Sequence, residues 1–157
     1  MNTVIAVFFL PFLVLTEWHL VNKQEWRQIV PLTSTRADVA RLLGPTQEAY
    51  FATYRLKEGN LFIEYSSGPC TPERRGGWNV AKDVVISVSF SPKRKRPIAE
   101  LKLDPQRFKK VVDEQVVGIL YYINDEEGIT YEVQSGKVES VEYGPTKKDE
   151  HLRCQLR

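Results

Sequence analysis

The sequence predicts an α+β protein in which two α-β-β-β units lie side by side, with their helices packed on one face of a curved antiparallel sheet. Three observations lead to this prediction. A capped amphipathic helix is expected at residues 36–43, three strands are expected after it, and the same order recurs about 68 residues later. Recurrence of one order of elements at a fixed spacing is typical of an internal repeat.

Length and composition agree with a folded protein. The 157 residues suit one domain, or two small repeats that share one core. A composition of 42% apolar and 27% charged residues is that of a globular protein. The net charge of +2 is too small to indicate nucleic acid or an anionic membrane as a partner.

The N-terminus suggests export. Residues 4–15 form an apolar run of 12 residues, shorter than the roughly 20 of a membrane-spanning helix. The run falls within the ~7–15 residues of a signal-peptide core, although no Lys or Arg precedes it and no A-x-A site follows. Pro11 also disfavours a spanning helix. We expect a signal peptide or N-terminal anchor at residues 1–16, the alternative being a buried strand or helix.

The first unit begins with the clearest element of the chain. Thr35 and Asp38 form a variant of the capping box, and Gly44-Pro45 ends the helix. Between them, Val39 and Leu43 lie on one face at helical spacing, together with Leu42. Strands are expected at residues 49–56, 61–66 and 84–90, with a hairpin turn at 57–60.

The second unit is expected to repeat this plan. Asp104-Pro105 is a preferred helix start, and Phe108, Val111 and Val112 follow where Val39, Leu42 and Leu43 stand in the first unit. Strands are expected at residues 117–123, 129–134 and 138–143. The predicted organisation is a linker at 17–28, a first unit at 29–92, a basic segment at 93–103, a second unit at 104–145 and a C-terminal tail at 146–157, with both units in one globular domain.

An insertion distinguishes the two units. Glu64 matches Glu132 at a spacing of 68 residues, whereas Ser87 matches Ser140 at a spacing of 53, so the first unit holds 15 additional residues. We assign them to residues 69–83, which contain Cys70, Arg74, Arg75 and Trp78. The corresponding place in the second unit is a plain turn at Ser135-Gly136.

The two cysteines are expected to form a disulfide if the chain is exported. A bond between Cys70 and Cys154 would close a loop of about 85 residues and stabilise the protein by at most ~4–5 kcal/mol. The alternative is a pair of free thiols in a reducing compartment. Two Cys and two His without C-x-x-C or H-x-x-x-H spacing do not indicate a metal site, and no cofactor is expected.

Catalysis has little support in the sequence. His19 and His151 fall in the predicted linker and tail, and neither a nucleophile-elbow nor a nucleotide-binding motif is present. We interpret Glu58, Glu64, Glu126 and Glu132 as solvated carboxylates and assign no catalytic residues.

Partner binding is better supported. Arg74, Arg75 and Trp78 are of the residue types enriched at interface hot spots, and the Gly-Gly between them allows a sharp bend. The alternative is that Trp78 covers the core beside Val80. The basic run at residues 93–96 is interpreted as a solvated loop, with contact to phosphate or an anionic surface as the alternative.

The segment I-x-P-L-T-S-T-R-A-D-V-A-R-L-L-G-P at residues 29–45 resembles the start of the SmpA/OmlA (BamE-like) domain. The apparent tandem copy is similar to the two αβ units of β-lactamase-inhibitor-protein-like folds. The resemblance implies an envelope or secreted protein that binds other proteins through a sheet face and loops. This chain departs from both groups, since it lacks a lipidated cysteine and has a single cysteine pair.

Together these features predict an exported, non-enzymatic protein-binding or structural module of the cell envelope or extracellular space. The partner is expected to be a protein rather than nucleic acid, and a membrane would be contacted only through an uncleaved N-terminal segment. The alternative function is a small-molecule or lipid carrier that uses the sheet face, and an enzyme comes third. An apolar pocket beside the sheet would favour the carrier, whereas a flat exposed patch around Trp78 would favour the partner binder.

Overall fold

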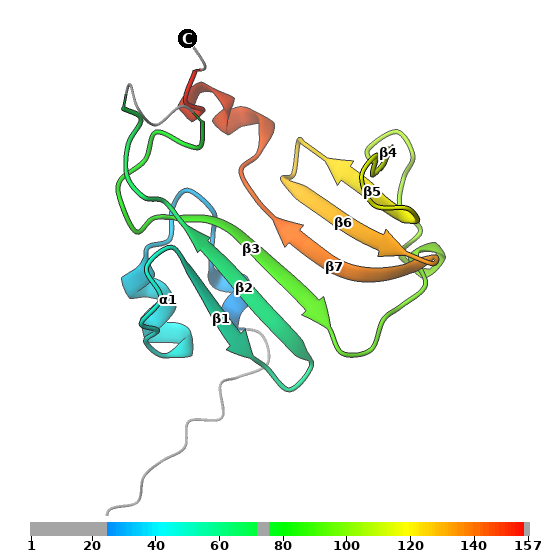
Figure 1. The fold of residues 1–157 in the computed structure, drawn as a ribbon, viewed down its shortest axis with the longest axis horizontal. Helices are drawn as coiled ribbons and strands as arrows, with labels where there is room; N and C mark the ends of the chain where they lie inside the picture. The colour runs from blue at the N-terminus through cyan, green and yellow to red at the C-terminus, as the bar shows by residue number, and fades with distance from the viewer. Residues whose placement is uncertain (1–24, 72–75, 156–157) are drawn as a thin grey trace, which may run out of the picture.

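One antiparallel sheet of seven strands, in the order β1-β2-β3-β7-β6-β5-β4, dominates the structure (Figure 1). The structure is a computed structural model that describes residues 25–71 and 76–155. The strands are β1 Phe51–Arg55, β2 Gly59–Tyr65, β3 Val85–Pro92, β4 Lys109–Val112, β5 Ile119–Asn124, β6 Ile129–Gln134 and β7 Lys137–Tyr143. The helical elements of the described ranges are α1 Arg36–Leu43 and three short 3₁₀ helices, η1 Glu25–Gln28, η2 Ile98–Leu101 and η3 Lys147–Leu152.

Helix α1 forms where the sequence predicts it. The Thr35 hydroxyl accepts a hydrogen bond from the Asp38 N–H, and the Asp38 carboxylate accepts one from the Thr35 N–H at 2.9 Å. This reciprocal capping box satisfies two donors that the helix start would otherwise leave without partners. Gly44, with φ +92°, ends the helix in a conformation that favours glycine.

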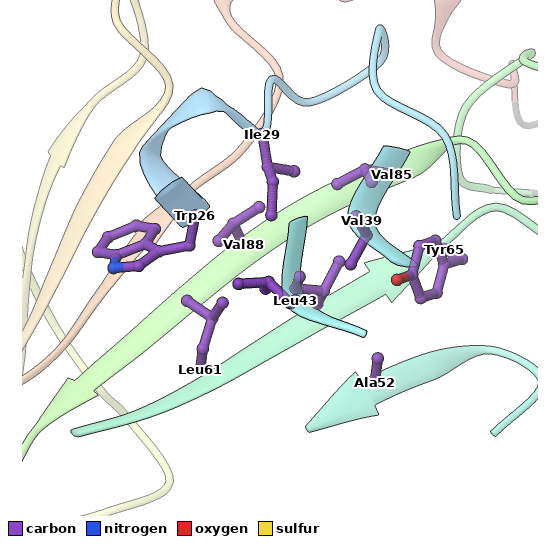
Figure 2. Packing of buried hydrophobic residues seen from close by; sticks show 10 residues of the cluster. Trp26, Ile29, Val39, Leu43, Ala52, Leu61, Tyr65, Val85 and Val88 are labelled. Atoms are coloured by element: carbon purple, nitrogen blue, oxygen red, sulfur yellow. The ribbon is translucent and has the colours of Figure 1, made fainter. Parts of the chain in front are cut away.

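The core lies between α1, η1 and one face of strands β1 to β3, which we call the inner face. Along β2, buried and exposed residues alternate, because successive side chains of a strand point to opposite faces. Leu61 and Ile63 are completely buried, and Val39 of α1 packs with them (Figure 2). Trp26 belongs to the same cluster, although residues 25–28 had been expected in a linker.

The predicted second helix is absent, because residues 109–112 form strand β4. The prediction of tandem α-β-β-β units is therefore wrong. Asp104 does start a turn, in which its carbonyl accepts the N–H groups of Arg107 and Phe108 at 3.0 Å. The chain then enters β4 and pairs with β5, Val111 lying opposite Tyr121. The β-branched Val111 and Val112 favour a strand, and pairing along β5 provides the backbone hydrogen bonds that a helix would have supplied.

What recurs is limited to the strands. The first meander, β1-β2-β3, and the second meander, β5-β6-β7, each shift register at a glutamate, Glu64 in β2 and Glu132 in β6. In each, a serine of the last strand donates to that glutamate: Ser87 to Glu64 at 3.4 Å, and Ser140 to Glu132 at 3.1 Å. The two meanders therefore share a local design without sharing a helix.

A short seam joins the two meanders. Strands β3 and β7 pair over three residues only, Val88–Phe90 of β3 with Val141–Tyr143 of β7, whereas β2 and β3 pair over seven. Beyond this seam the two groups of strands splay apart (Figure 1). The seam is where the surface of the protein is hollowed on both faces of the sheet.

Candidate functional site

A hollow of about 340 Å³ opens on the outer face of the sheet, the face turned away from α1. Its floor is polar and comes from four strands: Glu64 of β2, Ser87 of β3, Glu142 of β7 and Thr130 of β6. Trp78 and Arg153 also line it. We call it the outer hollow. It exists because β3 and β7 separate past their three paired residues.

Trp78 is held at this hollow by the C-terminal tail. It forms an isolated antiparallel bridge with Arg153, supported by hydrogen bonds from Asn79 N–H to the Leu152 carbonyl at 2.7 Å and from Cys154 N–H to the Gly77 carbonyl at 3.0 Å. The Arg153 guanidinium lies 4.6 Å from the centre of the indole ring, a cation–π contact. Figure 1 shows the tail beside the segment between β2 and β3.

The predicted disulfide is confirmed and completes this anchor. Cys70 and Cys154 are bonded, with their Cα atoms 5.7 Å apart, and the bond spans 84 residues of sequence. Cys70 N–H also donates to the Asn79 side chain at 3.2 Å. The tail is thus tied to the segment after β2 by one covalent bond and by backbone hydrogen bonds.

Of the three predicted partner-binding residues, the structure describes only Trp78. Trp78 lines the outer hollow and is partly exposed; it does not belong to the core cluster, so it is not the core lid considered as the alternative. Arg74 and Arg75 lie outside the described residues.

Sequence reasoning singled out only Trp78 and missed the other residues of the outer hollow, among them Arg153, Glu142 and Thr130. A signal existed for Arg153, because it precedes Cys154 and the disulfide brings that part of the tail to the segment holding Trp78. A signal also existed for Glu142. At the spacing of 53 residues it corresponds to Ser89 of the first meander, so a carboxylate replaces a hydroxyl there. Thr130 had none that we recognise.

Among the described residues, the lining of the outer hollow is acidic. Three carboxylate residues, Glu64, Asp125 and Glu142, line it together with one guanidinium, that of Arg153, which also pairs with Glu150 at 3.0 Å. Partial burial raises the pKa of the Glu142 carboxyl, and the negative charge of Glu64 raises it further, while a hydrogen bond with Ser87 acts in the opposite direction. The residue as a whole is nevertheless exposed, and contact with water makes this shift small. Such a site favours a cationic group over an anionic one.

Aromatic side chains extend the outer face beyond this hollow. The rings of Phe51 and Phe62 stack with their centroids 5.5 Å apart, although each residue is about two-fifths exposed, at 42% and 41%. Both lie on the outer face, where Phe51 is the partner of Glu64 in the β1–β2 register. Exposed, adjoining aromatic side chains are typical of interaction surfaces.

Three further findings concern other classes of function. Within residues 25–71 and 76–155, no group of three or more His, Cys, Asp and Glu side chains is arranged to hold a metal ion. In the same ranges, no helix has the length and apolar character needed to cross a membrane. The His151 imidazole lies on η3, where its Nδ1 is 2.9 Å from the Lys148 carbonyl oxygen.

Comparison of the chain with family models, with curated proteins and with solved structures finds no match in any of the three.

Proposed function

We propose that this protein is an exported, non-enzymatic binding module that recognises a partner protein through the outer face of its sheet. The observation that supports this most directly is the anchored Trp78, which borders an acidic hollow on the same face as the stacked and exposed pair Phe51 and Phe62. Interface hot spots are enriched in tryptophan, and a side chain whose position is fixed in advance loses less conformational entropy on binding.

The partner is expected to present a basic side chain. Among the described residues that line the outer hollow, the three acids Glu64, Glu142 and Asp125 outnumber the one base, Arg153. A lysine or arginine that enters it would meet carboxylates on the floor and the indole of Trp78 at the side, a combination suited to ion pairing and to a cation–π contact. Electrostatic complementarity of this kind would also speed association at low ionic strength.

The proposed compartment is an oxidising one reached by export. The Cys70–Cys154 disulfide suggests such a compartment, because disulfides persist mainly in secreted, periplasmic and surface proteins. Export itself rests on the apolar run at residues 4–15, which lies outside the described residues. The resemblance of residues 29–45 to envelope proteins agrees with this proposal.

Site-specific photo-cross-linking tests the proposal. A benzoylphenylalanine in place of Phe62 is expected to cross-link one discrete protein in the native host, and an excess of the unlabelled wild-type protein should compete this product away. The same group in place of Val30, which is 50% exposed on the inner side, should give no such product. Equal cross-linking from both positions, or none from Phe62, would contradict a partner on the outer face.

Quantitative binding to the cross-linked partner then tests Trp78. The Trp78→Ala variant is expected to bind at least tenfold more weakly, about 1.4 kcal/mol, as for an interface hot spot. A thiol assay that finds no free cysteine, together with an unchanged far-ultraviolet circular dichroism spectrum, shows that the variant retains its fold. Unchanged affinity in such a folded variant would count against Trp78 as a contact.

A further inference from the structure

A second hollow lies on the inner face, on the other side of the sheet from the candidate partner site. It has a volume of about 430 Å³ and spans the seam between the meanders. We call it the inner hollow. Six of its lining residues form an apolar and aromatic floor: Trp26, Phe90, Tyr131, Val138, Val141 and Tyr143. It is open because, within residues 25–71 and 76–155, the second meander has no counterpart of α1 on this face.

The floor of the inner hollow is preformed. The Trp26 ring stacks on Phe90 with centroids 5.2 Å apart and lies 6.0 Å from Tyr143, so the three rings form one surface from η1, β3 and β7. Trp26, Val138 and Val141 are each at least nine-tenths buried. Figure 2 shows the indole of Trp26 at one end of the core cluster, pointing away from Val39 of α1. A ligand would therefore meet a rigid apolar surface.

The rim of the inner hollow is basic. Arg27, Arg94 and Arg96 line it, and Glu58 is the one acid among the described residues of the lining. None of these three arginines forms a salt bridge with another residue of the described ranges. The guanidinium of Arg27 lies 5.6 Å from the centre of the Trp26 ring, at the junction of the aromatic floor and the charged rim.

The basic run at residues 93–96 divides its side chains between two tasks. Both lysines contact the protein itself: Lys93 donates to the Lys57 carbonyl at 3.1 Å, and Lys95 forms a salt bridge with Glu139. Both arginines line the inner hollow instead. The backbone of the run is held at each end, by Lys93 N–H to the Glu58 carbonyl at 2.8 Å and by Val138 N–H to the Arg96 carbonyl at 2.9 Å.

From this arrangement we infer that the inner hollow binds an anionic amphiphile, a molecule with one apolar body and one acid group. The apolar body would pack on Trp26, Phe90 and Tyr143, and the acid would be held by Arg94 and Arg96. The volume lies in the range of about 300–1,000 Å³ found for small-molecule pockets. The planar guanidinium suits both carboxylate and phosphate, since it can donate two parallel hydrogen bonds to either.

Charge complementarity selects this ligand class over others. A neutral apolar molecule would fill the floor and leave the three arginines without a partner, and a cationic one would be repelled by them. The chain's own apolar residues 4–15 contain no acidic side chain, so they lack the group that the rim is built to hold. This site is separate from the partner face, and either proposal stands if the other fails.

Titration of the full-length protein with dodecanoate, below the concentration at which it aggregates, tests the inference. Calorimetry is expected to show saturable binding of one molecule per chain, and tryptophan fluorescence should change because Trp26 lies in the floor. Dodecanol and dodecyltrimethylammonium, which have the same chain with a neutral or cationic head, should bind at least tenfold more weakly. Dodecyl phosphate distinguishes a phosphate-bearing ligand from a carboxylate.

Matched variants separate the rim from general charge effects. R94Q/R96Q is expected to weaken dodecanoate binding at least tenfold, whereas K93Q/K95Q, which removes the same charge from the same run, should change it less than twofold. Because an unfolded variant would also lose binding, each is first shown to melt cooperatively within a few degrees of the wild type. Leu101→Trp, at the edge of the hollow, should block binding while the arginines remain.

Three results would overturn the inference. They are equal affinity for dodecanol and dodecanoate, equal losses in the arginine and lysine variants, and absence of binding to the full-length protein. Absence of binding is the result expected if residues 4–15 themselves occupied the inner hollow.

Discussion

The two meanders of this protein show how similar strands acquire different surroundings. Both consist of three antiparallel strands with a register shift at a glutamate and a serine hydrogen bond to it. In the first meander, α1 and η1 cover the inner face and bury Leu61 completely. In the second, Ile129 at the corresponding position is only half-buried. Local strand patterns thus specify both meanders. Whether a helix covers the inner face depends on one short segment in each half, namely residues 36–43 and residues 104–112.

The two segments differ in the residues that follow their first turn. In α1 the capping box is followed by Val39 and Leu43, which are four residues apart and reach the sheet together. After Asp104 the chain has one turn and then Val111 and Val112, which enter β4 at the edge of the sheet. The difference shows that a good helix start does not decide a helix when a strand edge is available to the residues that follow.

Removal of the disulfide should have the largest effect, because it joins the segment between β2 and β3 to the tail that follows the second meander. The C70S/C154S variant is expected to lose about 4 kcal/mol of unfolding free energy, with ~4–5 kcal/mol as the upper bound for a loop of this length. Chemical denaturation measures the loss, and the reduced wild-type protein should show a similar one. A loss below about 1 kcal/mol would mean that the hydrogen bonds between Trp78 and Arg153 hold the tail unaided.

The next effect concerns the unequal cover of the two meanders. Leu61→Ala should cost about 3 kcal/mol, because it leaves a cavity in a closed core. Ile129→Ala, the matched change in the second meander, should cost only about 1–2 kcal/mol, since its side chain is already in partial contact with water. Urea denaturation of both variants gives the comparison. Equal losses would show that the second meander is as well covered as the first.

The smallest expected effect is at Glu142, the acidic counterpart of Ser89. Because the folded protein raises the pKa of Glu142, it binds more protons than the unfolded chain between the ordinary and the raised value. The free energy of unfolding therefore falls as the pH rises through that interval. Above the raised pKa, the destabilisation by the Glu142 charge reaches its full size. Glu142→Gln should raise the melting temperature at pH 7, by no more than about 3 °C, and leave it unchanged near pH 3.

Glu132→Gln is the control for this change. It removes the same charge from the same face but replaces the charged acceptor of the Ser140 hydrogen bond by a neutral amide oxygen, which weakens that bond, so no gain in stability is expected at pH 7. A gain of the same size in both variants would indicate a general effect of net charge. A loss in Glu142→Gln would show that the Glu142 charge stabilises the folded state.

Short-range patterns accounted for much of the fold. The capping box of Thr35 and Asp38, the end of α1 at Gly44 and the two hairpins after Lys57 and Asn124 were predictable, because each depends on residues a few positions apart. The disulfide was predictable for a different reason, since only one pairing of Cys70 and Cys154 exists. Of the outer hollow, Trp78 alone was singled out by residue type.

The remaining features depend on contacts between distant segments. Trp26 falls in the predicted linker, yet it packs on Phe90 and Tyr143, more than sixty and one hundred residues further along the chain. Within one basic run, Arg94 and Arg96 line the inner hollow, whereas Lys93 and Lys95 contact Lys57 and Glu139. No periodicity within a segment reports such neighbours, so the inner hollow and its basic rim could not be predicted.

The sequence by itself determined α1, the strands of both meanders and the only intramolecular disulfide available, because capping, alternation and cysteine count act locally or leave no choice. Tertiary structure alone decided that residues 109–112 form β4 rather than a helix, and that β3 and β7 pair over three residues. The physical reason is the same in both cases: the free energy of a strand depends on the partner that it finds, and that partner is distant in the chain. The two hollows proposed as binding sites result from this short pairing of β3 with β7.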